Sequence, residues 1–148
     1  MSLNHLFKNK IFLFLLLLQV STNSYALIKL NVETLMKNYI DEGLVLSTEF
    51  NSIKIIEEGL PSSFKLGDKL EFNLQINFEK DILNSGPSDL ISLGGSLTYF
   101  SGFKKMVFDL ERRKLRLGHK EAFYIQIDKD KKLEVYFKPS IKGFSNES

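Results

Sequence analysis

The sequence has no cysteine among its 148 residues. This absence excludes disulfides, thiolate metal sites and a cysteine nucleophile, and with them the lipidated cysteine that tethers exported bacterial lipoproteins. Histidine is limited to His5 and His119, which is too few for a His-rich zinc site, and no G-x-S-x-G elbow is present. We therefore expect no metal, no cofactor and no catalytic residues, and the sequence predicts a protein that is not an enzyme.

Long apolar runs are also missing, apart from one near the N-terminus. Two lysines precede an unbroken apolar run over residues 11–18, and Ser24-Tyr25-Ala26 then places small residues three and one before a cleavage point. This order is typical of a secretory signal, and the run is shorter than the roughly 20 apolar residues that span a bilayer. We expect residues 1–26 to be cleaved, leaving an exported protein that starts at Leu27, lies in the periplasm or outside the cell and has no membrane span.

The predicted mature chain also lacks an excess of positive or negative charge. Removal of the first 26 of 148 residues leaves 122, enough for one domain, with 18 basic and 18 acidic side chains. A neutral exported chain does not favour nucleic acid as a partner. Residues 27–90 carry a net charge of −5 and residues 91–148 a net charge of +5. We expect the two halves to pack together; head-to-tail self-association, or separate acidic and basic partner faces, is the alternative.

The start of the predicted mature chain has a helical pattern, and we expect residues 27–43 to hold one short helix. Asn31 is a candidate N-cap and Gly43 a candidate C-terminal stop. The apolar residues recur at helical spacing and form one stripe that would dock on a sheet: Val32, Leu35, Met36, Tyr39 and Ile40.

Apolar residues then alternate from Leu44 onward, as in strands. The clearest strand is Leu70–Phe78, which has one apolar and one polar face and is therefore expected in an antiparallel sheet. Further strands are predicted over residues 97–100, 105–110, 115–117, 122–127 and 133–137. Breaks or turns are predicted at residues 51–52, 84–89, 94–95, 111–114 and 128–132, with a flexible tail over 139–148.

Together these patterns predict a mainly β fold. We expect an antiparallel two-sheet sandwich over residues 44–138, with one short N-terminal helix on its edge. A single antiparallel sheet wrapped on the helix, as in cystatin-like folds, is the alternative.

The middle of the chain carries a sequence pattern that also occurs elsewhere. Its segments are Phe50-Asn51-Ser52-Ile53, Leu60-Pro61-Ser62-Ser63-Phe64-Lys65-Leu66-Gly67-Asp68, Leu70–Phe78, Ser85-Gly86-Pro87-Ser88-Asp89 and Tyr99-Phe100. The pattern resembles uncharacterised secreted bacterial β-sandwich proteins of the type seen among exosortase-sorted surface proteins. This resemblance implies a fold and an exported location but no catalytic residues. The Pro-Glu-Pro motif, apolar helix and basic anchor of those proteins are absent, so sorting by that route is not implied.

Two residues of this pattern also have a structural role that does not depend on the family. Phe64 is suited to plug one end of a sandwich, and Gly67 permits a tight entry into the next strand.

Basic residues cluster in the second half of the chain and form the one candidate binding site. They gather around the predicted turn at 111–114: Arg112, Arg113, Lys114, Arg116 and Lys120. Such a patch is suited to an anionic glycan or a lipid headgroup. The alternative is a solvated turn whose charges prevent pairing between sheet edges.

Four other features of the sequence are candidates for a chemical or a binding role. Glu57-Glu58, Asp109 and Glu111 are candidate paired carboxylates for a small hydrolase, if a cleft gathers them at a suitable separation. Asp128 and Asp130 have a D-x-D spacing, but interleaved lysines oppose calcium and favour a hairpin tip. His119 follows a glycine between two strands and is expected in a loop. Three tyrosines are candidates for stacking on a sugar ring: Tyr99, Tyr124 and Tyr136.

These observations favour an exported, single-domain protein that acts by binding or as a structural component of the surface or periplasm. Candidate partners are a surface or periplasmic protein or an anionic glycan. An anion-binding accessory domain and a small carboxylate-based hydrolase are the alternatives.

Overall fold

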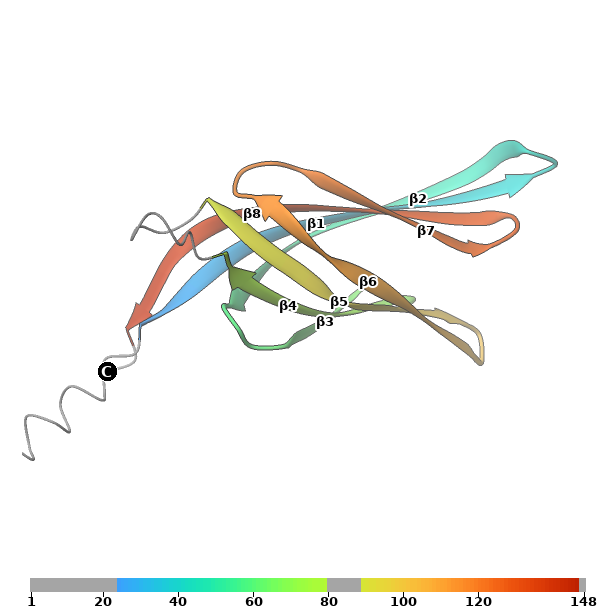
Figure 1. The fold of residues 1–148 in the computed structure, drawn as a ribbon. Helices are drawn as coiled ribbons and strands as arrows, with labels where there is room; N and C mark the ends of the chain where they lie inside the picture. The colour runs from blue at the N-terminus through green and yellow to red at the C-terminus, as the bar shows by residue number, and fades with distance from the viewer. Residues whose placement is uncertain (1–23, 80–88, 147–148) are drawn as a thin grey trace, which may run out of the picture.

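The chain folds into two facing antiparallel sheets (Figure 1). The computed structural model describes residues 24–79 and 89–146, and every regular element in them is a strand. The strands are β1 (Ser24–Ile40), β2 (Gly43–Glu57), β3 (Ser62–Leu66), β4 (Leu70–Phe78), β5 (Leu90–Ser101), β6 (Lys104–Arg116), β7 (Glu121–Asp128) and β8 (Lys131–Asn146). The predicted antiparallel two-sheet sandwich is confirmed, and the cystatin-like alternative is wrong because the described residues contain no helix.

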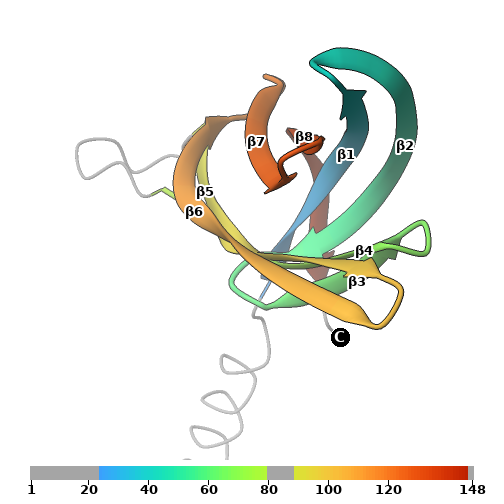
Figure 2. The same ribbon diagram turned by 90° about the vertical axis from the view of Figure 1, so that its right-hand side faces the viewer.

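The strands follow one another in an up-and-down order. The first sheet has the order β2-β1-β8-β7 and the second the order β3-β4-β5-β6. Strands that are consecutive in sequence are therefore paired except at β2–β3 and β6–β7, where the chain passes from one sheet to the other, and β8 returns to β1. Figure 2 shows the two sheets curving around a common interior. Because the strands alternate in direction, the turns β1–β2, β3–β4, β5–β6 and β7–β8 all lie at one end of the molecule (Figure 1), which we call the open end.

Aromatic side chains join the two sheets through the core. The Phe72 ring stacks on Phe64, with centroids 5.2 Å apart, and meets the edge of Phe137 at 6.1 Å. Phe137 in turn packs edge-on against Phe123 at 5.4 Å. Phe72 and Phe137 are fully buried, and such ring pairs add roughly 0.5–1.5 kcal/mol each beyond the area they bury. Phe64 thus packs in the sandwich as expected from its motif.

The predicted helix over residues 27–43 is wrong, because this segment is most of β1. Its buried residues alternate along the chain with a period of two: Ile28, Leu30, Val32, Thr34 and Met36. The helical stripe was a coincidence of spacing, since Leu35 and Tyr39 lie on the outer face with the polar residues. Pairing with β2 on one side and β8 on the other outweighs the local preference for a helix.

A two-residue turn follows β1. Asp41 and Glu42 have φ angles of 49° and 65°, as in the type I′ turns that match the twist of a hairpin. Gly43, expected to end the helix in a left-handed conformation, is instead the first residue of β2.

The predicted flexible tail over 139–148 is also wrong over most of its length, because β8 continues to Asn146. Pro139 is buried opposite Leu30 of β1. Pairing between β7 and β8 begins at Glu121 and Phe137, so Pro139 lies beyond this ladder. There its carbonyl accepts a hydrogen bond from Gly118 N–H at 2.7 Å, and no β7 residue requires an N–H from it.

The predicted breaks at residues 94–95 and 111–114 are a single β-bulge between two continuous strands. Leu93 pairs with Arg113 and Gly95 with Leu110, so β6 carries one extra residue opposite Gly94. A bulge of this kind reverses the inward and outward alternation of the strand. Accordingly Leu110 and Leu115, five residues apart, are both buried.

The predicted slip at residues 51–52 is wrong as well, because β2 pairs with β1 without interruption there. Ile53 and Ile55 lie on the outer face and are 56% and 43% exposed. The predicted strands from Leu70 to Phe78 and over residues 97–100, 105–110, 122–127 and 133–137 are confirmed as parts of β4 to β8. The separate strand predicted over 115–117 is the end of β6, which stops at Arg116 and leaves Leu117 in the turn that follows. The turn predicted within 128–132 is confirmed between β7 and β8. Residues 1–23 of the predicted leader and residues 84–88 of the predicted loop lie outside the described residues, whereas Ser24, Tyr25 and Ala26 belong to β1.

Candidate functional site

The two sheets do not cover each other at the open end. β1 and β2 have 17 and 15 residues, whereas β3 and β4 have 5 and 9. The hairpin of β1 and β2 therefore projects past the second sheet, and the sheets diverge toward their turns (Figure 1). Leu46 and Thr48 are placed by the β1–β2 register on the inner face of this hairpin, opposite Asn38 and Met36. Both are exposed, because no strand lies over them.

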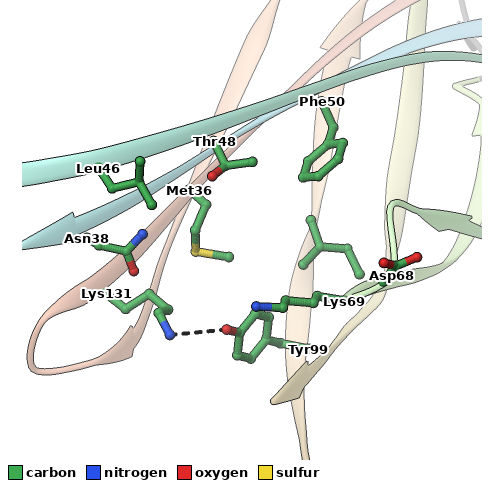
Figure 3. A pocket seen from close by; sticks show the side chains of 10 residues that line it. Met36, Asn38, Leu46, Thr48, Phe50, Asp68, Lys69, Tyr99 and Lys131 are labelled. Carbon is green, nitrogen blue, oxygen red and sulfur yellow. Dashed lines mark hydrogen bonds between the residues drawn. The ribbon is translucent and has the colours of Figure 1, made fainter. Parts of the chain in front are cut away.

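A cavity of about 400 Å³ occupies this divergence. It is lined by residues of both sheets (Figure 3): Met36, Asn38, Leu46, Thr48, Phe50, Asp68, Lys69, Leu70, Tyr99 and Lys131. Its volume lies at the lower end of the range of about 300–1,000 Å³ that is usual for small-molecule sites. Most of the lining is apolar, with a few polar groups, which is the composition such sites usually have.

The inner part of the cavity is firmly packed and the rim is not. Met36, Leu70 and Tyr99 belong to the buried core, whereas Leu46 is 58% exposed. Phe50 joins the rim to the second sheet by lying over Gly67 in the β3–β4 turn. Gly67 has a φ of 64°, and a Cβ at this residue would be 3.0 Å from the Phe50 ring. The glycine expected to permit a tight turn therefore also allows Phe50 to close one wall.

Lys131 supplies a positive charge from the first sheet. It is the first residue of β8 and pairs with Asn38 of β1, which directs it inward. The adjoining turn is fixed by two hydrogen bonds: Tyr39 N–H donates to the Asp130 carbonyl at 2.7 Å, and Asp130 N–H donates to Asp128 Oδ1 at 2.9 Å. The Lys131 ammonium donates to the Tyr99 hydroxyl at 3.2 Å (Figure 3).

Lys69 supplies a second positive charge from the opposite side. Its carbonyl accepts a hydrogen bond from Phe100 N–H at 2.8 Å, which fixes the β3–β4 turn against β5. Figure 3 shows the Lys69 and Lys131 side chains both pointing toward Tyr99, with Asp68 farther out. Among the described residues neither ammonium forms an ion pair with a carboxylate. With one aspartate and two lysines, the lining has a net charge of +1.

The predicted basic patch is distributed differently, because residues 112–116 lie in β6 and not in a turn. Three of its residues contact groups on the β4–β5 side of the second sheet. Arg112 donates to the Ser92 hydroxyl at 3.0 Å. Lys114 pairs with Glu79 at 3.7 Å and Arg116 with Asp89 at 3.3 Å.

The other two basic residues contact the first sheet. The Arg113 guanidinium lies 4.2 Å from the centre of the Phe123 ring and donates to the Ala122 carbonyl at 3.0 Å. Lys120 pairs with Glu33 and lies over the Tyr136 ring. Each of the five side chains thus has a partner within the chain, which reduces the charge available to an external anion. Their role as an anion-binding patch stays a prediction.

The four candidate carboxylates are not brought together. Glu57 ends β2 in the first sheet, and Glu58 accepts a hydrogen bond from Phe78 N–H at 3.1 Å. Asp109 and Glu111 are exposed on β6 in the second sheet, and none of the four lines the cavity. His119 lies in the β6–β7 connection, as predicted. Within residues 24–79 and 89–146 no group of three or more His, Asp or Glu side chains is arranged to hold a metal, and no helix is long and apolar enough to cross a membrane.

The three tyrosines separate into two environments. Tyr99 is buried and lines the cavity, whereas Tyr124 is 73% exposed and Tyr136 lies on the same outer face of the first sheet. There Glu134 accepts hydrogen bonds from Lys37 and from the Tyr136 hydroxyl, each 2.5 Å long. These bonds lower the pKa of Glu134, and the same carboxylate raises the pKa of Lys37 and raises that of Tyr136 to about 12.

Comparison with known proteins adds no family to this description. No family model, curated protein or solved structure matches the chain. The resemblance to secreted bacterial β-sandwich proteins therefore stays a prediction. The cavity itself was not predicted from the sequence. One signal pointed toward it: the alternation of Leu46, Thr48 and Phe50 was recognised as one face of a strand, but this face borders a cavity and is not buried in the core.

Proposed function

We propose that this is an exported, non-enzymatic binding protein that takes up a small, largely apolar molecule at its open end. The observation that supports the proposal is the cavity of about 400 Å³ between the diverging sheets, with buried Met36, Leu70 and Tyr99 at its inner wall. Apolar side chains that remain in contact with water at such a site favour an occupant that removes them from water.

The position of the cavity also supports a binding function. Its inner wall is anchored in the core, and the adjoining turns are fixed by hydrogen bonds to Asp130 and Lys69. A site whose inner wall is preformed binds with a smaller cost of ordering than a site that must form entirely on binding. The strands deliver the lining residues from both sheets, so the fold forms the site even though these residues are far apart in the sequence.

A neutral fluorescent dye tests the proposal. We expect N-phenyl-1-naphthylamine, whose emission rises in apolar surroundings, to bind the purified protein. The titration is expected to saturate at one dye molecule per chain. Phe50→Ser removes one wall and is expected to weaken binding about tenfold, as loss of an aromatic contact of 1–2 kcal/mol implies. Phe103→Ser is the matched control, because Phe103 is fully exposed at the open end and does not line the cavity.

Absence of dye binding to the original protein, or an equal effect of the two substitutions, would contradict the proposed function. Urea unfolding of both variants establishes that any loss at Phe50 comes from the site and not from the fold.

The export part of the proposal is supported by the leader pattern and is tested by mass. Cleavage after Ala26 gives a chain that starts at Leu27, three residues into β1. The Ala26 carbonyl accepts a hydrogen bond from Glu58 N–H at 3.1 Å in the uncleaved chain, so cleavage is expected before β1 pairs, during translocation. Recovery of the chain outside the cytoplasm with the mass of residues 27–148 is the expected result. An intact N-terminus in the cytoplasmic fraction would contradict export without affecting the cavity.

A further inference from the structure

The charge distribution of the cavity indicates which apolar molecules it accepts. We propose that its ligand is an amphipathic anion, such as a medium-chain carboxylate, whose acidic group binds Lys131 and Lys69 beside the Tyr99 hydroxyl. The hydrocarbon part then lies against Met36, Leu46 and Phe50. This inference rests on the proposed function and specifies its ligand class.

Lys69 is exposed, whereas Lys131 is half-buried. The Lys131 ammonium contacts the Tyr99 hydroxyl and the face of the Tyr99 ring, 5.4 Å from the ring centre. Among the described residues it has no carboxylate partner. A partly desolvated charge of this kind is stabilised by an opposite charge much more than an exposed one is.

Lack of a carboxylate partner does not by itself distinguish the two lysines, because among the described residues only Arg116, Lys114, Lys120 and Lys37 form ion pairs. Lys131 and Lys69 differ from the other unpaired basic residues in lining the same cavity from its two sides. The two lysines in the cavity are left without such partners although Asp68 is part of the same lining. Asp68 is exposed, and Figure 3 shows it away from the Lys131–Tyr99 pair. The positive charge at the inner position is therefore available to a ligand.

The apolar side chains and the positive charges occupy different parts of the cavity lining. The lysines approach Tyr99 from the two sheets, whereas Leu46, Met36 and Phe50 come from the β1–β2 hairpin (Figure 3). A molecule with one charged group and one hydrocarbon chain matches this division. The Tyr99 hydroxyl can donate its own proton to a carboxylate oxygen while its oxygen accepts from Lys131, so an acid makes both charged and neutral hydrogen bonds there.

Ligands of equal chain length separate charge from hydrophobicity. Dodecanoate and dodecyltrimethylammonium, each below its micelle concentration, and dodecanol, below its solubility limit, are titrated against the protein loaded with N-phenyl-1-naphthylamine. We expect dodecanoate to displace the dye at least tenfold more tightly than dodecanol, and the cation to bind most weakly. Lengthening the carboxylate is expected to tighten binding by up to about fourfold per methylene until the cavity is filled.

Substitutions locate the anion contact. Lys131→Met is expected to weaken dodecanoate binding about tenfold while leaving dodecanol and dye binding unchanged, and Lys69→Met to act in the same direction from the other sheet. Lys132→Met is the matched control, because Lys132 is the next residue of β8, faces outward and lies over the Tyr39 ring. It removes the same charge without touching the cavity.

The outcomes distinguish this inference from the proposed function. Equal binding of dodecanoate and dodecanol, or an equal effect of the substitutions at Lys131 and Lys132, overturns the inference while the cavity remains a binding site. Failure of the dye itself to bind overturns the proposed function. If Lys131→Met does not fold, Lys69→Met carries the same comparison.

Discussion

At the scale of single residues, Glu134 connects two groups on the outer face of the first sheet. Its bond from Lys37 and its bond from Tyr136 both favour the carboxylate, which lowers its pKa. This contribution to stability is present above the ordinary carboxyl pKa and is lost as the pH falls through the lowered value. The bond to Glu134 also raises the pKa of Tyr136 from 10.0 to about 12, so the contribution of the neutral phenol is present below pH 10 and is lost as the pH rises toward 12.

A phenylalanine at position 136 tests this assignment. Tyr136→Phe is expected to be less stable than the original protein at pH 8, and the difference is expected to shrink between pH 10 and 12 as the original phenol ionises. Urea unfolding from pH 8 to pH 12 measures the difference in stability and its decrease. Tyr124→Phe is the control, because Tyr124 lies on the same face but its hydroxyl makes no hydrogen bond among the described residues. A constant difference for Tyr136→Phe would contradict the account.

Gly95 is the residue at which the backbone tolerates no side chain. Its φ is 150°, and a Cβ would lie 2.0 Å from the Asn73 carbonyl oxygen of the neighbouring strand. Gly95→Ala is expected to cost about 3 kcal/mol or more, since the strands must separate to admit the methyl group. Gly102→Ala is expected to cost about 1–2 kcal/mol, because Gly102 has a φ of 59° but no atom within 4 Å of the added Cβ. Similar losses of unfolding free energy for Gly95→Ala and Gly102→Ala, measured with urea, would show that the positive φ alone accounts for the cost of both substitutions and would contradict the steric explanation.

At the scale of elements, each seam between the two sheets is crossed by a basic side chain over an aromatic ring. Lys54 of β2 lies 5.3 Å from the centre of the Phe64 ring in β3, and Arg113 of β6 lies 4.2 Å from that of Phe123 in β7. The two seams lie between β2 and β3 and between β6 and β7, which belong to different sheets and form no strand pairing with each other. These cation–ring contacts therefore help to hold the two sheets together where no backbone ladder joins them.

The seam at β6 and β7 leads to a comparison between two neighbouring basic residues. Arg113→Ala is expected to lower the free energy of unfolding by about 1–2 kcal/mol, through loss of the ring contact and of the bond to Ala122. Lys114→Ala is expected to change it by no more than about 0.5 kcal/mol, because its pair with Glu79 is exposed. Equal effects in urea unfolding would show that Arg113 does not stabilise the seam.

The elements predicted best from sequence were those with strict alternation. Leu70–Phe78 has apolar residues at every second position, and the structure has a strand over the same residues. The prediction of a helix over residues 31–43 was wrong because the helical period and the strand period fit the same apolar residues. Val32 and Met36, for example, are four residues apart, which places them on one face of a helix and also on one face of a strand. The choice between helix and strand depends on pairing with β8, about 100 residues away, which no local pattern contains.

At the scale of the whole molecule, the charge asymmetry of the chain is resolved within the fold. Each sheet contains two strands from each half of the chain, and all four ion pairs among the described residues join one half to the other. This arrangement agrees with the expectation that the halves pack together. It also explains why the residues of the predicted basic patch have so many partners: they lie on β6 and in the β6–β7 connection, between the two sheets, and their partners belong to both sheets.

The open end is likewise a property of the whole molecule. It arises from the difference in length between β1–β2 and β3–β4, and its lining joins Met36 to Tyr99 and Lys131. The sequence contains these residues at ordinary strand positions with nothing that marks them as neighbours. Such a site could be predicted only after the strand order and the register were known.

Chemical-shift mapping tests the central claim most directly. The protein, labelled with nitrogen-15 and with carbon-13 in its methyl groups, is titrated with N-phenyl-1-naphthylamine, whose rings shift the resonances of nearby nuclei. The account predicts the largest changes at the methyl groups of Met36, Leu46 and Leu70 and at the amides of Tyr99 and Lys131. Changes confined to the outer face around Tyr39 and Tyr124, or none at saturating dye, would contradict it.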